Sequence, residues 1–399
     1  MMTLTPSSTA DVQAAVAEAV AARAPLVLRG HGSKAGIGRP DGNEKPLFLA
    51  GLTGVTLYEP EELVLSARAG TPIAEIEALL DARGQELAFE PMSFHALAGT
   101  GQGTLGGAMM TNQSGPRRIK MGAARDHVLG VEAVSGRAEI FKAGGRVVKN
   151  VTGYDLAKGL CGSWGTLAVA TEVTVKVLPK AETAATLMLL GLPSARAVAA
   201  LSAALGSPAD VSGAAHLPLD AAARAGLPGP ATLMRLEGFE PSVAARFERL
   251  AVLLAPFGAA ERLAGEASAA LWRAVRDAAP IAEPAARAIW RISVAPTAGP
   301  TVAATVAAGR EAEAFYDWGG GLVWLATDPV DDGGAALIRG AVAAAGGGHA
   351  TLVRGPAALR ETIPVFQPQP AALAALGRRL KAEFDPYAIL NPARMAGDA

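Results

Sequence analysis

The sequence is almost free of cysteine, because Cys161 is the single one among 399 residues. One cysteine cannot form a disulfide within the chain, and it cannot supply the set of thiolates that holds an iron–sulfur cluster. We expect Cys161 to pack as a small apolar side chain rather than to react.

Neither a long apolar run nor a strong net charge is present. No stretch is long and apolar enough to span a bilayer, and Met1–Gln13 lacks the basic start and apolar core of a signal peptide. The formal net charge of −1 gives no bulk attraction to nucleic acid or anionic lipid. These absences predict a cytoplasmic protein with no membrane span and no nucleic-acid partner.

Apolar residues and glycine, by contrast, are abundant. Half of the residues are hydrophobic, which is enough for a substantial core, and the length favours two domains. From about Ala181 the sequence becomes alanine-rich, directly after a predicted strand that ends in Leu178-Pro179-Lys180. We therefore expect a first domain over residues 1–180 and a second over 181–380.

Helices and strands are predicted to mix without strict β–α–β order, which favours an α+β fold. Ala10–Arg23 has helical spacing, and Thr71 is expected to cap a helix that runs to about Arg83. Leu167–Leu178 alternates apolar and polar positions, as a half-exposed strand does. The other strands expected in the first domain are Leu26–Leu28, Val55–Tyr58, Leu63–Ala69, and a hairpin of Val128–Val134 with Ala138–Phe141.

The second domain is predicted to contain an antiparallel sheet covered by alanine-rich helices on one face. Its expected strands are Ala231–Leu236, Ile289–Val294, Leu322–Leu325 and Ala350–Val353.

Three glycine-rich segments carry the functional signal. The first, Leu28–Lys34, follows a predicted strand and contains Gly30 and Gly32. Two glycines let the backbone turn so that successive N–H groups form an anion site, to which Ser33 would add a hydroxyl donor. An ordinary glycine turn explains the same residues equally well.

The second segment, Gly99–Gly115, contains a Gly101-x-Gly103-x-x-Gly106 match to a dinucleotide-binding motif. We reject this match, because no apolar strand precedes it and so much glycine makes a match expected by chance. We favour a loop that enters a short helix near Thr104–Met110, whose first N–H groups are free to bind pyrophosphate.

The third segment runs from Lys149 to Asp155 and continues as Gly162–Thr166 into a strand. Thr152 and Asp155 have the spacing of a capping box, which accounts for both without a functional role.

The order and spacing of these segments resemble FAD-linked oxidases of the vanillyl-alcohol-oxidase/p-cresol-methylhydroxylase (PCMH) type. That family has an arginine–glycine loop, a glycine-rich segment with an asparagine, an Arg-Asp-x-Val-Leu-Gly stretch and a Gly-Tyr-Asp-Leu…Gly-Ser-x-Gly-Thr stretch. The corresponding stretches here are Arg29–Ser33, Gly103–Gly115, Arg125–Gly130 and Gly153–Glu172.

Within that family the chain is similar to the FAD-binding subunits of bacterial glycolate oxidase (glycolate dehydrogenase). The supporting stretches are Lys149–Leu156, Trp290–Val294, Gly347–Leu352 and Phe384–Met395. The resemblance implies a two-subdomain FAD-binding fold over 1–180, an α/β cap domain over 181–380, and a C-terminal segment, 381–399, that returns to the FAD domain.

The resemblance also implies which residues contact FAD. Those that would hold the pyrophosphate are Gly30, His31, Gly32 and Ser33. Those that would line the flavin and ribityl region are Thr104, Gly106, Gly107, Asn112 and Gly115. Those that would close over the other side are Gly162, Thr166 and Val169, while Pro91 and Met92 approach the cofactor. Some relatives attach flavin through a histidine at the position of Ser33, so we expect noncovalent FAD here.

Oxidation of a small 2-hydroxy acid by flavin needs a cation for the carboxylate and a base near the hydroxyl. Arg291 is a candidate cation and His349, which follows Gly346–Gly348, a candidate base. A surface salt bridge and a strand-entry histidine explain the same two residues. Catalytic relatives carry a histidine-rich, metal-binding stretch, whereas the five histidines here are scattered. We therefore expect no metal site.

The resemblance implies a subunit of a complex that oxidises glycolate, or a similar acid such as D-lactate, to the 2-oxo acid. The expected partners are a second FAD-linked oxidase subunit, which has the histidine stretch, and an iron–sulfur subunit that receives electrons. The complex could bring the chain to the inner face of the bacterial membrane as a peripheral protein. A freestanding FAD-dependent 2-hydroxy-acid dehydrogenase and a non-catalytic flavin-binding scaffold subunit remain open as alternatives.

Overall fold

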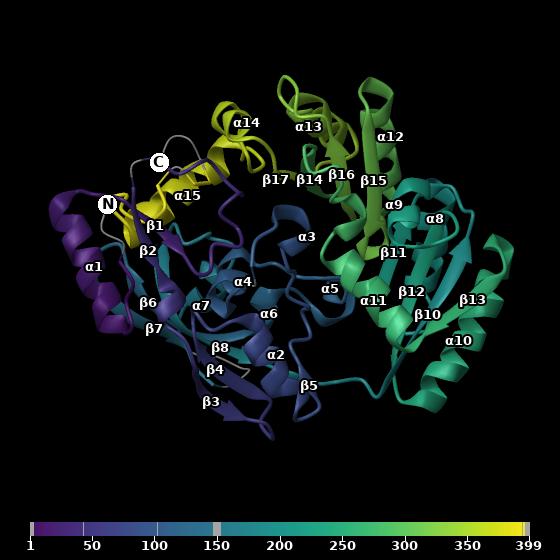
Figure 1. Cartoon of the computed structure of the whole chain (residues 1–399), viewed down its shortest axis with the longest axis horizontal. Coiled ribbons are helices and arrows are strands. Elements are labelled where there is room, and N and C mark those ends of the chain that lie inside the picture. Colours follow the sequence, from purple (N-terminus) through teal and green to yellow (C-terminus); the bar gives the residue numbers. More distant parts are fainter. Residues whose placement is uncertain (1–3, 43, 102, 147–152, 393, 396–399) are drawn as a thin grey trace. The chain divides into compact units, whose positions relative to one another are not determined.

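The computed structural model describes residues 4–42, 44–101, 103–146, 153–392 and 394–395. The chain divides into two compact units (Figure 1). Unit 1 comprises Met1–Ser114, Gly122–Lys180 and Pro368–Ala399, and unit 2 comprises Gly115–Met121 and Ala181–Gln367. These units differ from the expected domains in two places, because 115–121 groups with unit 2 and the chain returns to unit 1 at Pro368 rather than at 381.

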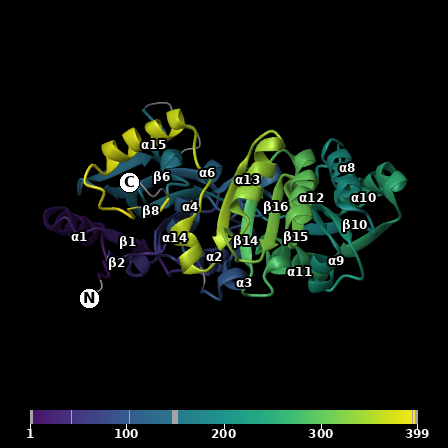
Figure 2. The ribbon, with the colours of Figure 1, turned by 90° about the horizontal axis from the view of Figure 1, so that it is seen from above.

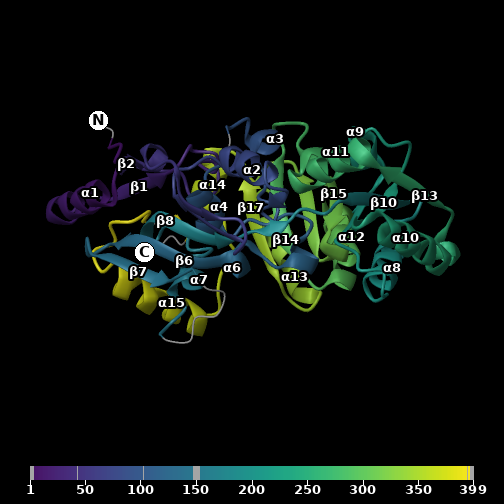
Figure 3. The ribbon, with the colours of Figure 1, turned by 90° about the horizontal axis from the view of Figure 1, so that it is seen from below.

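Unit 1 is built on a five-stranded antiparallel sheet in the order β3–β4–β8–β6–β7. Its strands are β3 (Val55–Glu59), β4 (Val64–Arg68), β6 (Val128–Ser135), β7 (Ile140–Gly144) and β8 (Ala168–Lys176). Figure 3 shows β7, β6 and β8 side by side. The predicted hairpin is confirmed, since β6 pairs with β7 and Val134 lies opposite Ile140.

Strand β8 is the centre of this sheet and is mostly buried, so the prediction of a half-exposed strand is wrong. One core cluster covers one of its faces through Val173, and a second cluster contains Val169. Thr171 and Thr174 of this strand can be buried because both hydroxyls form hydrogen bonds. Thr171 Oγ1 donates to the Glu132 carbonyl at 3.2 Å, and Thr174 Oγ1 shares a 2.8 Å hydrogen bond with Ser66 Oγ.

The helices of unit 1 are mostly short. They are α1 (Thr9–Ala22), α2 (Ile73–Asp81), α3 (His95–Ala98), α4 (Leu105–Thr111), α6 (Ala124–His127), α7 (Leu156–Leu160) and α15 (Ala371–Phe384). The predicted Thr71 cap of α2 is wrong, because Pro72 occupies the N-cap position. The Thr71 hydroxyl instead accepts from Gly54 N–H at 3.0 Å and donates to the Arg68 carbonyl at 2.7 Å. In the third glycine segment, Thr152 lies outside the described residues, and Asp155 caps α7 by accepting from Lys158 N–H.

A smaller parallel sheet pairs β1 (Leu26–Arg29) with β2 (Lys45–Phe48). The end of the chain extends this sheet, because Leu26 N–H donates to the Ile389 carbonyl at 2.7 Å and Asn391 N–H donates to the Leu26 carbonyl at 2.9 Å. These bonds place the C-terminal residues beside the glycine loop that follows β1. The remaining pair of unit 1, β5 (Gln85–Glu86) with β9 (Leu178–Pro179), is antiparallel.

Unit 2 contains an eight-stranded antiparallel sheet in the order β13–β10–β12–β11–β15–β16–β14–β17. Four of its strands were predicted, namely β12 (Ala231–Gly238), β14 (Ala288–Ser293), β16 (Leu322–Thr327) and β17 (His349–Arg354). The four that the sequence did not reveal are β10 (Thr183–Leu190), β11 (Gly213–Leu217), β13 (Ala260–Ala264) and β15 (Ala312–Asp317). Alanine has low strand propensity, so pairing between neighbours, rather than local preference, holds alanine-rich strands such as β11.

The helices of unit 2 cover both faces of this sheet. They are α5 (Arg118–Met121), α8 (Ser194–Leu205), α9 (Leu219–Arg224), α10 (Glu240–Leu254), α11 (Gly265–Arg276), α12 (Gly299–Gly309), α13 (Ala335–Ala344) and α14 (Ala357–Thr362). Figure 2 shows α8, α10, α12 and α13 along one side and α11 on the other. The predicted cover on one face alone is therefore wrong, and Trp272 of α11 donates to Thr186 Oγ1 at 2.8 Å from the opposite side.

In the described part of the chain, no helix is both long and apolar enough to cross a membrane.

Candidate functional site

One cavity in unit 1 brings together segments that lie far apart in the sequence. It encloses about 750 Å³ of space, part of it open to solvent, between the first glycine loop, α4, β8 and the end of the chain. The residues expected to contact FAD that line it are Gly30, His31, Gly32, Ser33, Thr104, Gly106, Gly107 and Val169. Residues from all three glycine-rich segments and the strand after them therefore meet at one site.

The first glycine loop has the free donors that an anion needs. Among the described residues, no acceptor is bonded to any of the five consecutive N–H groups from Gly30 to Lys34. Gly32 has a φ of +75°, a conformation that favours glycine. At Gly30, a Cβ atom would lie 2.6 Å from Thr104 Oγ1, so the loop approaches α4 too closely for a side chain. The loop fits a pyrophosphate by the geometry of a backbone anion nest.

The N-terminus of α4, by contrast, is not free to bind an anion, so that part of our interpretation is wrong. Leu105 N–H donates to the Thr71 carbonyl and Gly106 N–H to the Ala69 carbonyl, both at 2.9 Å. Gly107 N–H donates to Thr104 Oγ1 at 3.1 Å. The glycines serve close packing instead, because a Cβ on Gly106 would lie 2.7 Å from Ala69 Cβ.

Three further expected contacts lie in unit 1 but do not line the cavity. Asn112 ends α4 in the left-handed conformation and accepts from Arg125 N–H at 3.0 Å. Gly162 N–H donates to the Met110 carbonyl at 2.9 Å, and Thr166 Oγ1 donates to the Ser163 carbonyl at 2.7 Å. These bonds hold the backbone next to the cavity wall.

The remaining expected contacts are also absent from the residues that line the cavity. Pro91 and Met92 are buried and are not among its lining residues. Gly115 belongs to unit 2, where its carbonyl accepts from Trp318 Nε1 at 3.0 Å.

The C-terminal segment supplies two lining residues that the sequence did not assign. Asn391 Oδ1 accepts from Leu28 N–H, and its Nδ2 donates to the Trp164 carbonyl, both at 2.7 Å. Arg394 Nη2 donates to the Lys34 carbonyl at 2.8 Å, which ties the glycine loop to the end of the chain. The resemblance of Phe384–Met395 to the family was the available signal, but it named no cofactor residue there.

Lys34 is a third lining residue that the sequence did not assign, although it directly follows the expected loop. It is 9% exposed. Burial lowers the pKa of its ammonium group to about 8. The cavity therefore combines free amide donors with a buried cation, which is the chemistry that binds a diphosphate.

The two candidate catalytic residues lie on one face of the unit 2 sheet. Arg291 pairs with Thr351 and Ser293 pairs with His349 between β14 and β17, so all four side chains point the same way. The opposite face carries Trp290 and the core under α12 and α13. His349 is exposed.

Arg291 is half-buried and packs against an aromatic ring. Its guanidinium lies 4.9 Å from the centroid of the Trp318 ring, and that of Arg118 lies 4.4 Å from the same centroid. Burial, followed by the charge of Arg118, lowers the pKa of Arg291 to about 10. The charge of Asp317 acts in the opposite direction and raises this pKa, so a carboxylate of unit 2 lies close enough to interact with Arg291.

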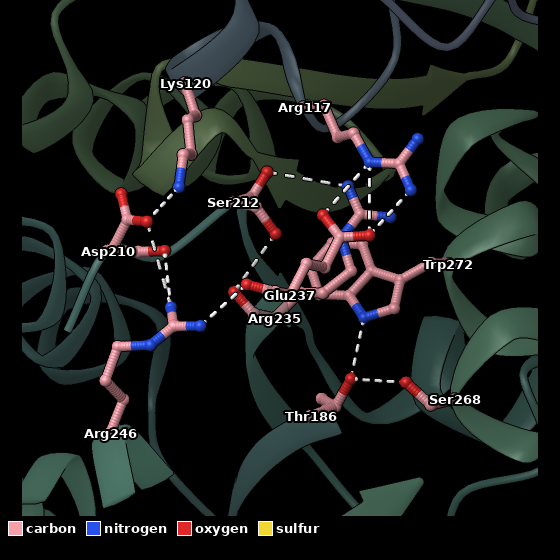
Figure 4. A network of polar contacts seen from close by, with 10 residues as sticks. All are labelled: Arg117, Lys120, Thr186, Asp210, Ser212, Arg235, Glu237, Arg246, Ser268 and Trp272. Carbon is pink, nitrogen blue, oxygen red and sulfur yellow. Dashed lines mark hydrogen bonds and ion pairs between the residues drawn. The ribbon is translucent and has the colours of Figure 1, made fainter. Parts of the chain in front are cut away.

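The segment that carries Arg118 is fixed to unit 2 on both sides (Figure 4). Arg117 forms a bidentate ion pair with Glu237, at 2.6 Å from Nη2 and 3.0 Å from Nε, and Lys120 pairs with Asp210. This network explains why Gly115–Met121 groups with unit 2.

Within the described ranges, no group of three or more His, Cys, Asp or Glu side chains is arranged to hold a metal ion. Cys161 packs against the unit 1 core, and burial raises the pKa of its thiol to about 12.

Comparison with known proteins agrees with this cavity and fold. A family model described as an FAD binding domain matches residues 2–144. The chain is 33% identical over 381 residues to glycolate oxidase subunit GlcE of Escherichia coli (strain K12), covering 95% of each protein. It is 32% identical over 169 residues to glycolate oxidase subunit GlcD of Bacillus subtilis (strain 168), covering 42% of this chain and 35% of that one. It is 36% identical over 154 residues to a D-lactate dehydrogenase of Archaeoglobus fulgidus, covering 35% of each.

Solved structures show the same fold at low sequence identity. p-Cresol methylhydroxylase with substrate bound superposes with a TM-score of 0.76 at 13% identity, covering 98% of this chain and 88% of that one. Alkyldihydroxyacetonephosphate synthase gives a TM-score of 0.68 at 18% identity, covering 97% and 75%. The predicted α+β, PCMH-type fold is thereby confirmed. The chain belongs to the FAD-linked oxidoreductases of the vanillyl-alcohol-oxidase/PCMH type, in the family of glycolate oxidase subunit GlcE.

Proposed function

We propose that this chain is the FAD-binding subunit of a complex that oxidises glycolate, or a similar small 2-hydroxy acid such as D-lactate, to the 2-oxo acid. The observation that carries the proposal is the similarity to GlcE along 95% of both chains. The reaction removes two electrons and two protons, because one hydrogen leaves the carbon that bears the hydroxyl and one proton leaves the hydroxyl oxygen. The flavin supplies the redox chemistry, and an iron–sulfur partner receives the electrons.

The FAD of this chain is bound noncovalently in the unit 1 cavity. Gly30, His31, Gly32 and Ser33 hold the pyrophosphate through their free N–H groups, and the serine hydroxyl adds a donor. Ser33 stands where some relatives have the histidine that attaches flavin. The other lining residues proposed to contact the cofactor are Thr104, Gly106, Gly107 and Val169. The residues proposed to support that wall are Asn112, Gly162 and Thr166, while Pro91, Met92 and Gly115 remain predictions.

Arg291 and His349 are the proposed catalytic residues of this chain. The Arg291 guanidinium, which lies over the Trp318 ring, suits a substrate carboxylate, and His349 lies on the same face of the sheet.

Partners complete the proposed enzyme. Two relatives are named as glycolate oxidase subunits, GlcE and GlcD, which supports a multisubunit complex. Cys161 is the single cysteine, so clusters must come from another chain. We propose a second FAD-linked oxidase subunit and an iron–sulfur subunit.

Glycolate oxidation with an artificial electron acceptor tests the proposal. The chain alone should turn over poorly, because it lacks the histidine-rich stretch expected in the second FAD-linked subunit, and general acid–base groups contribute about 10²–10⁴ in rate. Adding both partner subunits should restore activity. If the chain alone turned over glycolate as fast as the complete assembly, that result would favour a freestanding dehydrogenase. Full activity of a complex built with a chain that cannot bind FAD would favour a scaffold. No glycolate or D-lactate oxidation by the complete assembly would reject the proposed substrate class.

A further inference from the structure

Lys34 is a buried cation in the wall of the FAD cavity. Lysine is almost never fully buried unless it is paired. Its Nζ atom lies 3.5 Å from Ser33 Oγ and 5.2 Å from the centroid of the Phe94 ring, and the residue is 9% exposed. A hydroxyl and an aromatic face stabilise an ammonium group only partly, because neither neutralises its charge.

No carboxylate of the described residues forms an ion pair with Lys34. The acidic group near the loop, Asp41, already pairs with Arg29 and with Arg394, whose Nη1 lies 3.5 Å from Asp41 Oδ1. Burial is the single cause that lowers the pKa of Lys34 to about 8, with no neighbouring charge opposing it. The other titratable groups around the loop are His31 in the loop itself and His95 of α3, next to Thr100, which donates to the Ser33 carbonyl.

The ammonium group lies between the glycine loop and α4. Cβ atoms built on Gly103 and on Gly107 would each lie 3.6 Å from Nζ, and one on Gly103 would lie 3.7 Å from Ser33 Oγ. These distances are ordinary van der Waals contacts, so they place the ammonium group directly beside both glycines. Lys34 also lines the cavity beside five N–H groups that have no acceptor in the described chain.

We propose that Lys34 is the counter-charge of the FAD pyrophosphate, and that its ammonium group binds phosphate oxygens that the loop amides also hold. The backbone donors orient the diphosphate, while Lys34 supplies the positive charge that the nest lacks. In the absence of cofactor the buried cation is uncompensated and destabilises the fold, so FAD binding and folding are coupled. The proposal depends on FAD binding and is independent of the substrate that the enzyme oxidises.

Lys34→Met tests the charge in a side chain of similar length. FAD affinity of the apo-protein, measured by flavin fluorescence, should fall about 10–100-fold, as expected for a lost hydrogen bond to a charged group. Lys34→Arg should retain most of the affinity. Riboflavin, which has no phosphate, should bind wild type and Lys34→Met equally. Lys142→Met is the matched control, since Lys142 is an exposed lysine of the same unit, and it should bind FAD like wild type.

The apo-protein offers a readout that a merely structural lysine would not give. Lys34→Met should raise the unfolding midpoint of the apo-protein, because it removes an unpaired buried charge, while it weakens FAD binding. Unchanged FAD affinity, or an equal loss of riboflavin affinity, would overturn the proposal. A lower apo-protein midpoint would assign Lys34 to packing instead.

The pH dependence of the wild-type protein gives a test that needs no variant. Lys34 titrates near pH 8 without FAD and must be protonated to bind the diphosphate, so FAD affinity should fall above pH 8, by up to about tenfold per pH unit. Riboflavin affinity should lack the fall above pH 8, and an identical profile for both ligands would reject the role of Lys34 even if Lys34→Met failed to fold.

Discussion

Adding one methyl group at Gly30 should damage the FAD site through a clash that the structure specifies. The new Cβ would lie 2.6 Å from Thr104 Oγ1 and 3.0 Å from Thr104 Cγ2. Thr104 cannot turn away freely, because its Oγ1 accepts from Gly107 N–H and caps α4. Overpacking of this kind costs about 1–3 kcal/mol. We expect Gly30→Ala to lower the free energy of unfolding by that amount and to weaken FAD binding.

A double-mutant cycle with Thr104→Ser isolates the part of the clash that Cγ2 makes, because serine retains the nearer Oγ contact. Serine keeps the capping hydroxyl, so Thr104→Ser alone should cost little, while it removes the Cγ2 atom that Gly30→Ala meets. The double variant should therefore be more stable than the sum of the single changes predicts, by about 0.5 kcal/mol or more. Denaturant unfolding of the apo-protein and FAD titration measure both effects. Additive changes would refute the Cγ2 contact, and a Gly30→Ala protein that matches wild type in both assays would refute the close approach of the loop to α4.

Two other substitutions test separate parts of the account. Gly107→Trp should abolish FAD binding by filling the cavity beside α4, whereas Arg291→Ala should leave flavin content unchanged; a folded Gly107→Trp protein with normal FAD would show that the second glycine segment is misassigned. In unit 2, Arg235 and Arg117 hold the pKa of Glu237 at about 2 although burial alone would raise it. The ordinary pKa of a glutamate is 4.5, so the ionised Glu237 carboxylate should stabilise the fold by about 3 kcal/mol above pH 4.5. This stabilisation should decrease progressively as the pH falls toward 2. In urea unfolding, the difference in the free energy of unfolding between wild type and Glu237→Gln should therefore become smaller below pH 4.5. A difference that does not change with pH would contradict the proposed stabilisation by the Glu237 charge.

The sequence predicted the strands whose own residues favour extended structure, and it missed those that depend on their neighbours. Val128–Val134 is rich in β-branched residues and was found, whereas the alanine-rich β11 was not. The sequence predicts strand β8 but predicts it as half-exposed, because threonine is usually exposed. The buried partners of its threonine hydroxyls, Glu132 and Ser66, are known only from the structure.

For the candidate site, the glycine loop could be predicted and its neighbours could not. Gly32 has a local conformational reason to be glycine, which one segment of sequence can reveal, whereas Gly30 is glycine because the loop approaches Thr104 closely. Asn391 and Arg394 join the cavity through long-range pairing, since the end of the chain lies beside β1. The prediction of a free N-terminus at α4 is wrong for the same reason. The carbonyls of Thr71 and Ala69, from a distant loop, accept hydrogen bonds from the first N–H groups of this helix.

The flavin content of the purified chain tests the central claim most directly. The account predicts a yellow protein that carries equimolar FAD, all of which acid precipitation releases into the supernatant, since Ser33 forms no covalent link. Colour retained in the pellet would contradict noncovalent binding. A correctly folded chain that binds no FAD, even when FAD is added, would contradict the assignment of the unit 1 cavity itself.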